Sequence, residues 1–204
     1  MNRLIGITGG MSAGKTTLSK KIIKANPDFL YIDMDIFRRS LYQNKDYVEE
    51  LKRVIPELRR YLEINSPIIN KYIYTNPNYM NKYKQILYKY LFKYLNTIKN
   101  KTILIDWALI VNDNLQERFD KIIFLDTDIN VRLKRLIGSD LQKEEILKRF
   151  ELQKINNLES YASDKFLILN NGGNDMEKIN NFINGMECKF TLPNNEGKAI
   201  WEIT

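Results

Sequence analysis

The chain has 204 residues, of which 44% are hydrophobic and 28% charged, a composition typical of a folded domain and not of a disordered chain. No segment approaches the about 20 consecutive apolar residues that a bilayer-spanning helix needs, and the single cysteine, Cys188, excludes an intrachain disulfide. Histidine is absent, which excludes zinc sites built from histidine and Ser-His-Asp catalysis, so any general base must be Asp, Glu or Lys.

The formal net charge of +7 is carried mostly by lysines mixed with glutamates along predicted helices, without a basic tail. This pattern favours a solvated lysine surface over a nucleic-acid interface. Residues 1–7 run directly into a glycine-rich loop, so we expect no signal peptide. We therefore expect a cytoplasmic protein that acts on small molecules, without nucleic-acid or membrane partners, and we leave its oligomeric state open.

The first predicted elements in chain order are a strand, a glycine-rich loop and a helix. Arg3–Thr8 is a short apolar run typical of a buried parallel strand. The spacing of apolar residues predicts a helix over Lys15–Ala25, which Pro27 ends. Phe29–Ile32 predicts the second strand, and a further helix follows it through Leu41.

Residues 45–100 contain no strand candidate and predict three helices, with breaks near Pro67 and Pro77. The third helix has the clearest pattern, because apolar and tyrosine residues recur at helical spacing from Tyr83 to Ile98. We expect these helices to form a helical insertion.

The second half of the chain returns to strands alternating with helices, and it ends in a short β-like tail. The predicted elements are the strands Thr102–Asp106, Lys121–Asp126 and Phe166–Leu169, the helices at about 129–137 and 143–157, a last helix that follows the glycines at 172–173 and ends at about 183, and a hairpin within residues 186–204.

This alternation predicts an α/β fold with a five-stranded parallel sheet and helices on both faces. Ligands of such sheets bind at the carboxyl ends of the strands. The glycine-rich loop, Asp33, Asp35 and Asp106 all follow predicted strand ends. We therefore expect them to contribute to one site.

The glycine-rich loop matches the phosphate-loop pattern, with a strand before it and a helix after it. Glycines let backbone amides approach phosphate oxygens, and the helix N-terminus favours anions. Lys15 would supply charge to the β- and γ-phosphates of ATP, and the Thr16 hydroxyl would bind Mg²⁺. The alternative is a simple glycine turn between a strand and a helix. The residues predicted to bind the nucleotide are Gly10, Met11, Ser12, Ala13, Gly14, Lys15, Thr16 and Thr17.

Asp33 and Asp35 lie two residues apart just after the second predicted strand. If the strand geometry continued, both carboxylates would point to the same side. One carboxylate could then accept a proton from an attacking hydroxyl while the other oriented the acceptor or a metal-bound water. The alternative for each residue is that its carboxylate caps the next helix.

The run from Ile5 to Thr17, followed by Ile32-Asp33-Met34-Asp35, resembles the dephospho-coenzyme A kinase family, which has a P-loop kinase fold. Weaker likeness extends over most of residues 3–185, including Asp106 and the pair Arg149 and Gln153. The resemblance implies phosphorylation of the ribose 3′-hydroxyl of dephospho-coenzyme A by ATP and Mg²⁺, with residues 45–100 receiving the acceptor and a lid at about 138–150.

The resemblance also implies roles for individual residues. Asp35 would be the catalytic base and Asp33 its neighbour in the acceptor site. Arg38 and Asp106 would bind the acceptor, and Lys15 would act in catalysis. Arg135 would act in catalysis and would close with Arg149 over the phosphates from the lid, and Asn171 and Gly172 would lie near the adenine of ATP. The alternative for the two arginines is a basic helix face exposed to water.

The chain departs from the family pattern mainly on the acceptor side. The family's His-Pro pair corresponds to Tyr88-Lys89, its Pro-Leu-Leu element corresponds to residues 108–110, and a second lid arginine is replaced near Gly138-Ser139. Three hypotheses therefore remain open: a divergent dephospho-coenzyme A kinase, a kinase of another nucleoside or nucleotide, and a nucleotide-binding regulatory module with little catalysis.

Overall fold

The structure is a computed structural model, which describes residues 2–137, 146–147, 150–151, 153–155, 161, 163–170, 175–185, 188–190 and 201–203. The chain forms two compact units. The helical unit comprises Asp33–Asn100, and the sheet unit comprises Asn2–Ile32 with Lys101–Thr204. In the described part of the chain, no helix is both long and apolar enough to cross a membrane.

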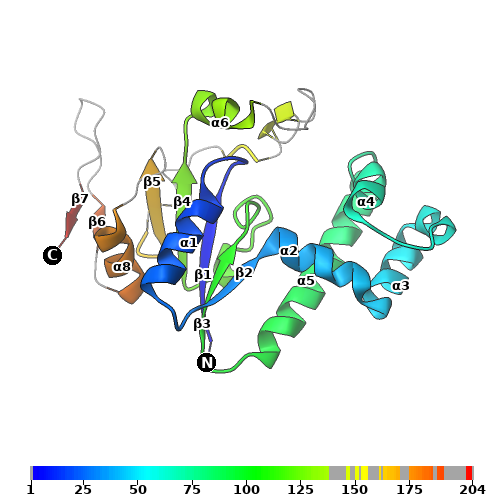
Figure 1. Cartoon of the computed structure of the whole chain (residues 1–204), viewed down its shortest axis with the longest axis horizontal. Helices are drawn as coiled ribbons and strands as arrows, with labels where there is room; N and C mark the ends of the chain where they lie inside the picture. Colours follow the sequence, from blue (N-terminus) through cyan, green and yellow to red (C-terminus); the bar gives the residue numbers. More distant parts are fainter. Residues whose placement is uncertain are drawn as a thin grey trace. The chain divides into compact units, whose positions relative to one another are not determined.

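The sheet has five strands in the spatial order β2-β3-β1-β4-β5, and β1 lies at its centre (Figure 1). β1 pairs in parallel with β3 and β4, and β4 pairs in parallel with β5. The order confirms the predicted α/β fold with a five-stranded sheet. The strand bounds are β1 Arg3–Gly9, β2 Leu30–Asp33, β3 Thr102–Asp106, β4 Lys121–Asp126 and β5 Phe166–Asn170.

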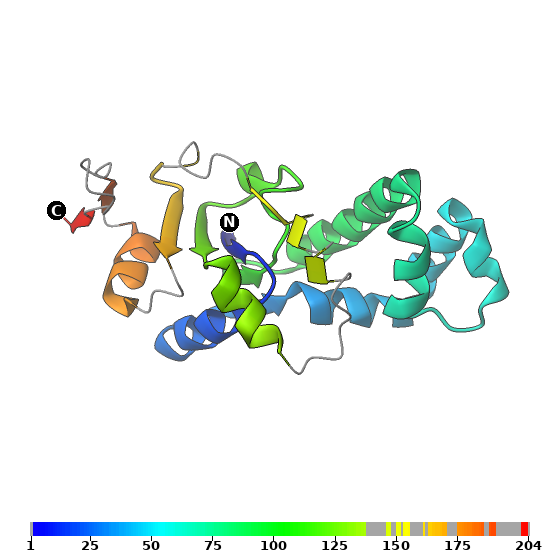
Figure 2. The same ribbon diagram turned by 90° about the horizontal axis from the view of Figure 1, so that it is seen from above.

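The strands form where apolar residues run without interruption, because a parallel sheet is buried on both faces. Ile5 and Ile7 of β1 are fully buried, and they point to the face that two helices cover. These helices are α1 (Lys15–Ala25) and α8 (Met176–Asn184), which lie on the same side of the sheet in Figures 1 and 2.

The opposite face of β1 packs against the loop that follows β3. A Cβ added to Gly6 would come within 2.6 Å of Ile110 and 3.1 Å of Phe119. Ile110 and Phe119 are buried, and the short 3₁₀ helix η3 (Gln116–Arg118) precedes Phe119. The absence of a side chain at Gly6 therefore allows this loop to close on the sheet.

The helical unit contains the three helices predicted within residues 45–100. Asn65 and Asn76 cap α4 and α5 with their side chains, and Pro67 and Pro77 lie in the first turns. Proline is tolerated there because the amides of a first turn have no partner within the helix. The elements of this unit are α2 Met34–Ser40, η1 Leu41–Gln43, α3 Lys45–Val54, η2 Pro56–Arg60, α4 Ser66–Ile73 and α5 Pro77–Thr97.

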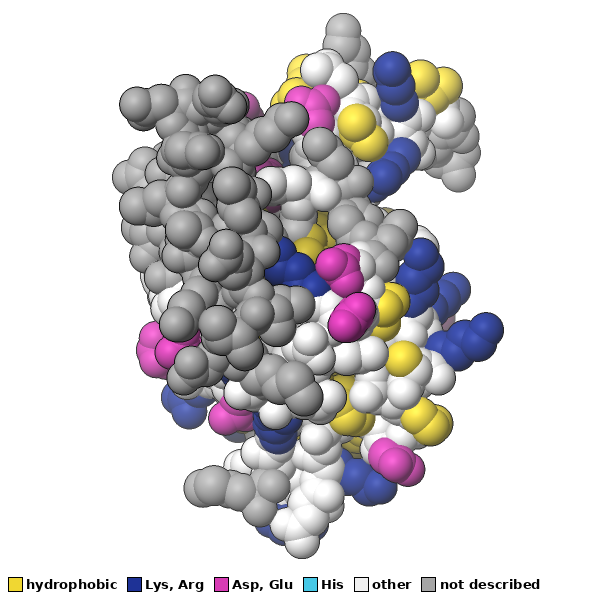
Figure 3. Space-filling view, turned by 90° about the vertical axis from the view of Figure 1, so that its left-hand side faces the viewer, with side chains coloured by type: hydrophobic (Ala, Val, Ile, Leu, Met, Phe, Trp, Pro, Cys, Tyr) yellow, Lys and Arg dark blue, Asp and Glu magenta, His cyan; other side chains and the backbone are white. Residues whose placement is uncertain are grey.

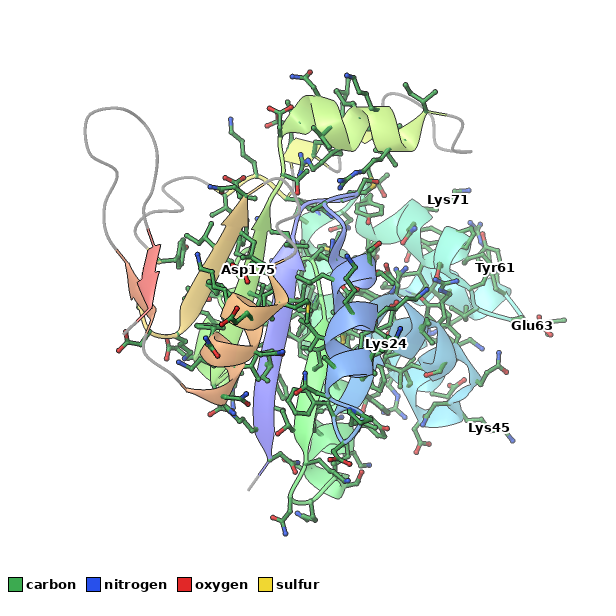
Figure 4. All side chains as sticks on the ribbon, turned by 60° about the vertical axis from the view of Figure 1, so that its left-hand side comes forward. Lys24, Lys45, Tyr61, Glu63, Lys71 and Asp175 are labelled. Carbon is green, nitrogen blue, oxygen red and sulfur yellow. The ribbon has the colours of Figure 1, made fainter. Side chains whose placement is uncertain are left out.

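Buried tyrosines and aliphatic residues hold the helical unit together. The rings of Tyr47 on α3 and Tyr90 on α5 meet edge to face, with centroids 5.1 Å apart. A second aromatic cluster combines Arg60 with Tyr61 and Tyr72, whose hydroxyls are 3.2 Å apart. Tyr61 is labelled at the end of the helical unit in Figure 4.

The remaining described elements belong to the sheet unit. α6 (Ile129–Leu136) follows β4 after an Asp128 cap. The antiparallel strands β6 (Cys188–Phe190) and β7 (Trp201–Ile203) agree with the predicted hairpin, although the connection between them lies outside the described residues, as does most of the helix predicted over 143–157. On the face drawn in Figure 3, basic and acidic side chains are interspersed.

Candidate functional site

The phosphate loop is shaped by glycines in backbone conformations that other residues rarely adopt. Gly9 has a φ of 137° and Gly14 a φ of 103°. A Cβ at Gly9 would also come within 2.6 Å of the Leu125 carbonyl oxygen on β4. These two glycines therefore let the chain leave β1 and turn sharply into α1.

α1 begins at Lys15 directly after this loop, and its N-cap residue Gly14 provides no capping side chain. The amides of a first helical turn have no partner within the helix, and they form the positive end of its dipole. The residue after β4 holds the loop, since Thr127 Oγ1 donates to the Ala13 carbonyl at 3.0 Å. Just before the loop, Thr8 Oγ1 on β1 donates to the Ala108 carbonyl at 3.1 Å, in the segment after β3. The N-terminus of α1 is thus suited to an anion.

The Lys15 side chain folds back over the loop. Its Nζ donates hydrogen bonds to the carbonyl oxygens of Gly9 at 3.1 Å and Gly10 at 3.0 Å. The loop's own carbonyls therefore hold the ammonium group above the phosphate loop, where it can reach a bound phosphate.

Thr16 and Asp106 come together at the carboxyl end of β3. Thr16 Oγ1 donates to Asp106 Oδ2 at 2.8 Å, and the Tyr31 hydroxyl approaches the same oxygen at 3.4 Å. Asp106 is only 6% exposed. The sequence led us to expect Asp106 in the acceptor site, whereas the structure places its carboxylate beside the hydroxyl predicted to bind Mg²⁺.

This pair of oxygen donors fits the requirements of Mg²⁺. Mg²⁺ usually takes one or two protein oxygens, directly or through water, and completes its octahedron with water and substrate phosphates. Among the described residues, no group of three or more His, Cys, Asp or Glu side chains could form a separate all-protein metal site. Thr16 and Asp106 therefore offer the kind of oxygen ligands that would suit a Mg²⁺ ion bound together with a nucleotide.

The expectation that Asp33 and Asp35 extend from a strand on the same side is wrong. β2 ends at Asp33, and α2 begins at Met34. Asp33 Oδ1 accepts hydrogen bonds from the amides of Asp35 at 2.8 Å and Ile36 at 3.1 Å. Asp33 is thus the N-cap of α2, the alternative considered from sequence, because unpaired first-turn amides attract a carboxylate.

The Asp35 side chain lies in the first turn of α2 and is 76% exposed. Its Oδ1 is 3.6 Å from Arg38 Nη2 one turn later. Burial tends to lower the pKa of Arg38, but Tyr83, Tyr42 and Asp35 outweigh that effect and raise it. Within the helical unit, Asp35 is therefore an exposed carboxylate beside a permanently charged guanidinium.

Arg135 on α6 and Gln153 contact the phosphate loop within the sheet unit. Arg135 Nη1 donates to the Ser12 carbonyl at 2.9 Å. The Met11 amide donates to Gln153 Oε1 at 2.6 Å. Gln153 therefore ties the segment after the predicted lid to the loop, a contact that its place in the sequence did not reveal.

Several predicted site residues lie outside the described residues. They are Arg149, Asn171, Gly172 and most of the lid at 138–150.

Sequence reasoning also missed Arg132, which lies against the phosphate loop. A Cβ added to Gly10 would overlap Arg132 Nη1. A signal for it was present, because Arg132 and Arg135 are three residues apart on one helix and therefore share a face.

Comparison with known proteins agrees with this geometry. Residues 3–175 match the family model of dephospho-CoA kinase. The dephospho-CoA kinase of Fusobacterium nucleatum is 24% identical over 174 residues, covering 82% of this chain and 89% of the relative. The uridine kinase of Borreliella burgdorferi is 26% identical over 156 residues, covering 70% of this chain and 69% of the relative.

Two solved structures share the fold. The crystal structure of TT1252 from Thermus thermophilus is similar with a TM-score of 0.68 and 20% identity, covering 90% of this chain and 95% of that chain. The dephospho-CoA kinase from Campylobacter jejuni has a TM-score of 0.52 and 18% identity, with the same coverage of 90% and 95%. The family match spans most of the chain and agrees with the parallel sheet and its phosphate loop, so this chain belongs to the dephospho-CoA kinase family and is a kinase.

Proposed function

We propose that this kinase transfers the terminal phosphoryl group of ATP, with Mg²⁺, to the ribose 3′-hydroxyl of dephospho-coenzyme A, giving coenzyme A and ADP. The observation that carries the proposal is the Thr16–Asp106 pair, 2.8 Å apart beside the phosphate loop, in a chain that matches the family over residues 3–175. A phosphate loop next to a strand-end carboxylate is the arrangement in which P-loop enzymes hold a nucleoside triphosphate with Mg²⁺.

On the nucleotide side, the loop amides and the first turn of α1 would bind the phosphates, and Lys15 would reach the β- and γ-phosphates. Thr16 and Asp106 would hold Mg²⁺, which neutralises phosphate charge as it develops in the transition state. This part of the proposal depends on residues of the sheet unit alone.

On the acceptor side, we assign the general base to Asp35. The Asp33 carboxylate already accepts two hydrogen bonds from α2 amides, whereas Asp35 is exposed. Asp35 would take the proton of the acceptor hydroxyl as its oxygen bonds to the γ-phosphorus and the bond from that phosphorus to the β-phosphate oxygen breaks. Arg38 would contribute positive charge to binding of the acceptor's phosphates.

The lid at about 138–150, with Arg149, would close over the phosphates and exclude water, which would otherwise compete as acceptor. Arg135 would add charge near Ser12, where its guanidinium already donates to the loop. Asn171 and Gly172 would lie near the adenine of ATP. These assignments rest on the family resemblance alone for Arg149, Asn171 and Gly172, which lie outside the described residues.

A second candidate function is phosphorylation of another nucleoside or nucleotide. The similarity to a uridine kinase favours this alternative, and the chain has Tyr88-Lys89 where the family has His-Pro. The nucleotide side would be the same in both cases, because both reactions need the phosphate loop. The two functions differ only in the acceptor that is recognised.

The deciding experiment is a coupled assay of the purified protein with Mg-ATP, comparing dephospho-coenzyme A with a panel of nucleosides and nucleoside monophosphates. We expect turnover with dephospho-coenzyme A and identification of the 3′-phosphate by NMR of the product. Activity restricted to a nucleoside or nucleotide would replace the proposal by the second candidate. Binding of ATP without transfer to any acceptor would contradict both and favour a regulatory module.

A further inference from the structure

α6 lies beyond the carboxyl end of β4 in the sheet unit (Figures 1 and 2). Its Arg132 lies close to Gly10 of the phosphate loop. Its Nη1 occupies the space where a side chain at Gly10 would begin. Its Cζ lies 4.2 Å from the centre of the Phe150 ring. The guanidinium is therefore held between an aromatic ring and the backbone of the loop.

One nitrogen of this guanidinium lacks an acceptor among the described residues. Arg132 Nε is buried and has no hydrogen-bond partner among the described residues. Burial lowers the pKa of Arg132, and the nearby Asp126 and Asp128 oppose that effect without reversing it. A buried charged donor without a partner is costly, so proteins retain such groups where a ligand supplies the missing acceptor.

Lys15 contacts the same glycine. Lys15 Nζ is 3.0 Å from the Gly10 carbonyl oxygen, and Arg132 Nη1 lies where a Gly10 side chain would be. Two cations thus converge on the part of the loop from which the P-loop lysine reaches the β- and γ-phosphates. An anion with several oxygens, such as a phosphate group, can accept from both.

Arg132 and Arg135 differ in how their guanidinium groups are engaged. Arg135 is exposed and donates to the Ser12 carbonyl at 2.9 Å. Arg132 is half-buried, stacked on Phe150 and lacks a partner for Nε among the described residues. The burial and stacking fix the position of Arg132 before any ligand arrives, which lowers the entropic cost of binding.

We propose that Arg132 binds the terminal phosphate of the nucleoside triphosphate, and that Phe150 is a positioning residue for its guanidinium. The proposal rests on the proposed function and deepens it, because it names a residue that distinguishes ATP from ADP. It also explains Gly10, since any larger residue there would displace the guanidinium.

The test is isothermal titration of the full-length protein with Mg-ADP and with the magnesium complex of a non-hydrolysable ATP analogue. We expect Arg132→Gln to weaken binding of the ATP analogue by roughly tenfold or more, and binding of ADP by less than about threefold. Arg132→Lys should recover part of the loss. Lys134→Gln is the matched control, because it removes one charge from an exposed position of the same helix and should change neither affinity.

Phe150→Leu provides a second variant that keeps the arginine and retains an apolar side chain. We expect it to weaken binding of the ATP analogue by about threefold with ADP binding unchanged, because the guanidinium loses a cation–π partner. Equal loss for both nucleotides, or unchanged affinity for the ATP analogue in Arg132→Gln, would overturn the proposal.

This experiment is independent of the acceptor. The wild-type protein could transfer no phosphate to dephospho-coenzyme A while Arg132→Gln selectively loses affinity for the ATP analogue. In that case the proposed acceptor is wrong and the role of Arg132 stands. If transfer to dephospho-coenzyme A occurs but Arg132→Gln shows no selective loss of affinity for the ATP analogue, the proposed function stands and the role of Arg132 is wrong.

Discussion

At the scale of single residues, the aspartates show how local backbone geometry separates side chains that look equivalent in the sequence. Asp33 satisfies the amides at the start of α2, whereas the carboxylate of Asp35 is exposed. Asp106 is buried and accepts a hydrogen bond from Thr16. Each carboxylate therefore has a distinct expected effect when it is replaced.

The first prediction separates the two aspartates of α2. Asp33→Ala should reduce the free energy of unfolding by about 1 kcal/mol, because it removes an N-cap. Asp35→Asn should leave that free energy nearly unchanged while lowering kcat by roughly 10²-fold or more, with little change in ATP binding, because it removes the general base. Urea unfolding and steady-state kinetics of both variants provide the measurements. Loss of stability in Asp35→Asn as large as its loss of activity would argue for a structural role instead.

The second prediction concerns magnesium. Asp106→Asn should raise the Mg²⁺ concentration needed for half-maximal transfer, because an amide is a weaker ligand or water acceptor for a hard cation than a carboxylate. Titration of Mg²⁺ at fixed ATP measures the effect, and addition of EDTA to the wild type should abolish transfer. Asp120→Asn provides the control, because it also removes one carboxylate charge but lies just before the first residue of β4, away from the strand ends that carry Asp106. An unchanged Mg²⁺ requirement in Asp106→Asn would separate this carboxylate from the metal.

At the scale of elements, α1 and α8 stabilise the sheet that carries the phosphate loop. Leu18 and Ile22 of α1 and Phe182 of α8 belong to one buried cluster with β1 and β4 residues. Lys121 Nζ lies 4.8 Å from the centre of the Phe182 ring, so this ring is also covered at the start of β4. α8 begins at its Asp175 cap, labelled in Figure 4.

The third prediction follows from that packing. Phe182→Ala should reduce the free energy of unfolding by about 3–5 kcal/mol, since it removes a large buried ring and leaves a cavity. Urea denaturation followed by circular dichroism measures the change. Glu177→Ala, at an exposed position of the same helix, should change it by less than about 0.5 kcal/mol. A similar change in both variants would show that burial of the Phe182 ring does not determine the contribution of α8.

The elements themselves were predicted closely. β3 and β4 have the predicted bounds, and α4 and α5 begin at the predicted breaks near Pro67 and Pro77. The main error was at Asp33, where the strand was expected to continue. At such a junction the chain can continue as a strand or begin a helix. A carboxylate that caps the helix favours the helical start and moves the boundary by one or two residues.

At the scale of the whole molecule, the chain combines a sheet unit that contains the phosphate loop with a helical unit that contains Asp35 and Arg38. The compact helical unit begins at Asp33, earlier than the insertion expected at about residue 45, because α2 and η1 belong to it. Nucleotide binding to the sheet unit should therefore be detectable without any acceptor.

The fourth prediction is that Mg-ATP raises the melting temperature of the wild-type protein. A ligand at about 100 times its Kd adds about 2.7 kcal/mol to the free energy of unfolding when it binds only the folded state. Lys15→Ala should lose most of this stabilisation together with transfer activity, because the β- and γ-phosphates lose their cation. Lys20→Ala, at an exposed position of α1, should retain both. Equal stabilisation of Lys15→Ala by Mg-ATP would contradict the phosphate-loop assignment.

The sequence alone determined the strand pattern, the phosphate loop and the family resemblance, because these depend on local periodicity and on residues contiguous in the chain. Only the tertiary structure brought Asp106 to Thr16, Gln153 to Met11 and Arg132 to Gly10. These pairs are separated by roughly 90 to 140 residues, and no periodic pattern relates their positions. Parallel strand order and the packing of α6 decide which distant side chains meet, since the carboxyl ends of all strands share one edge of the sheet.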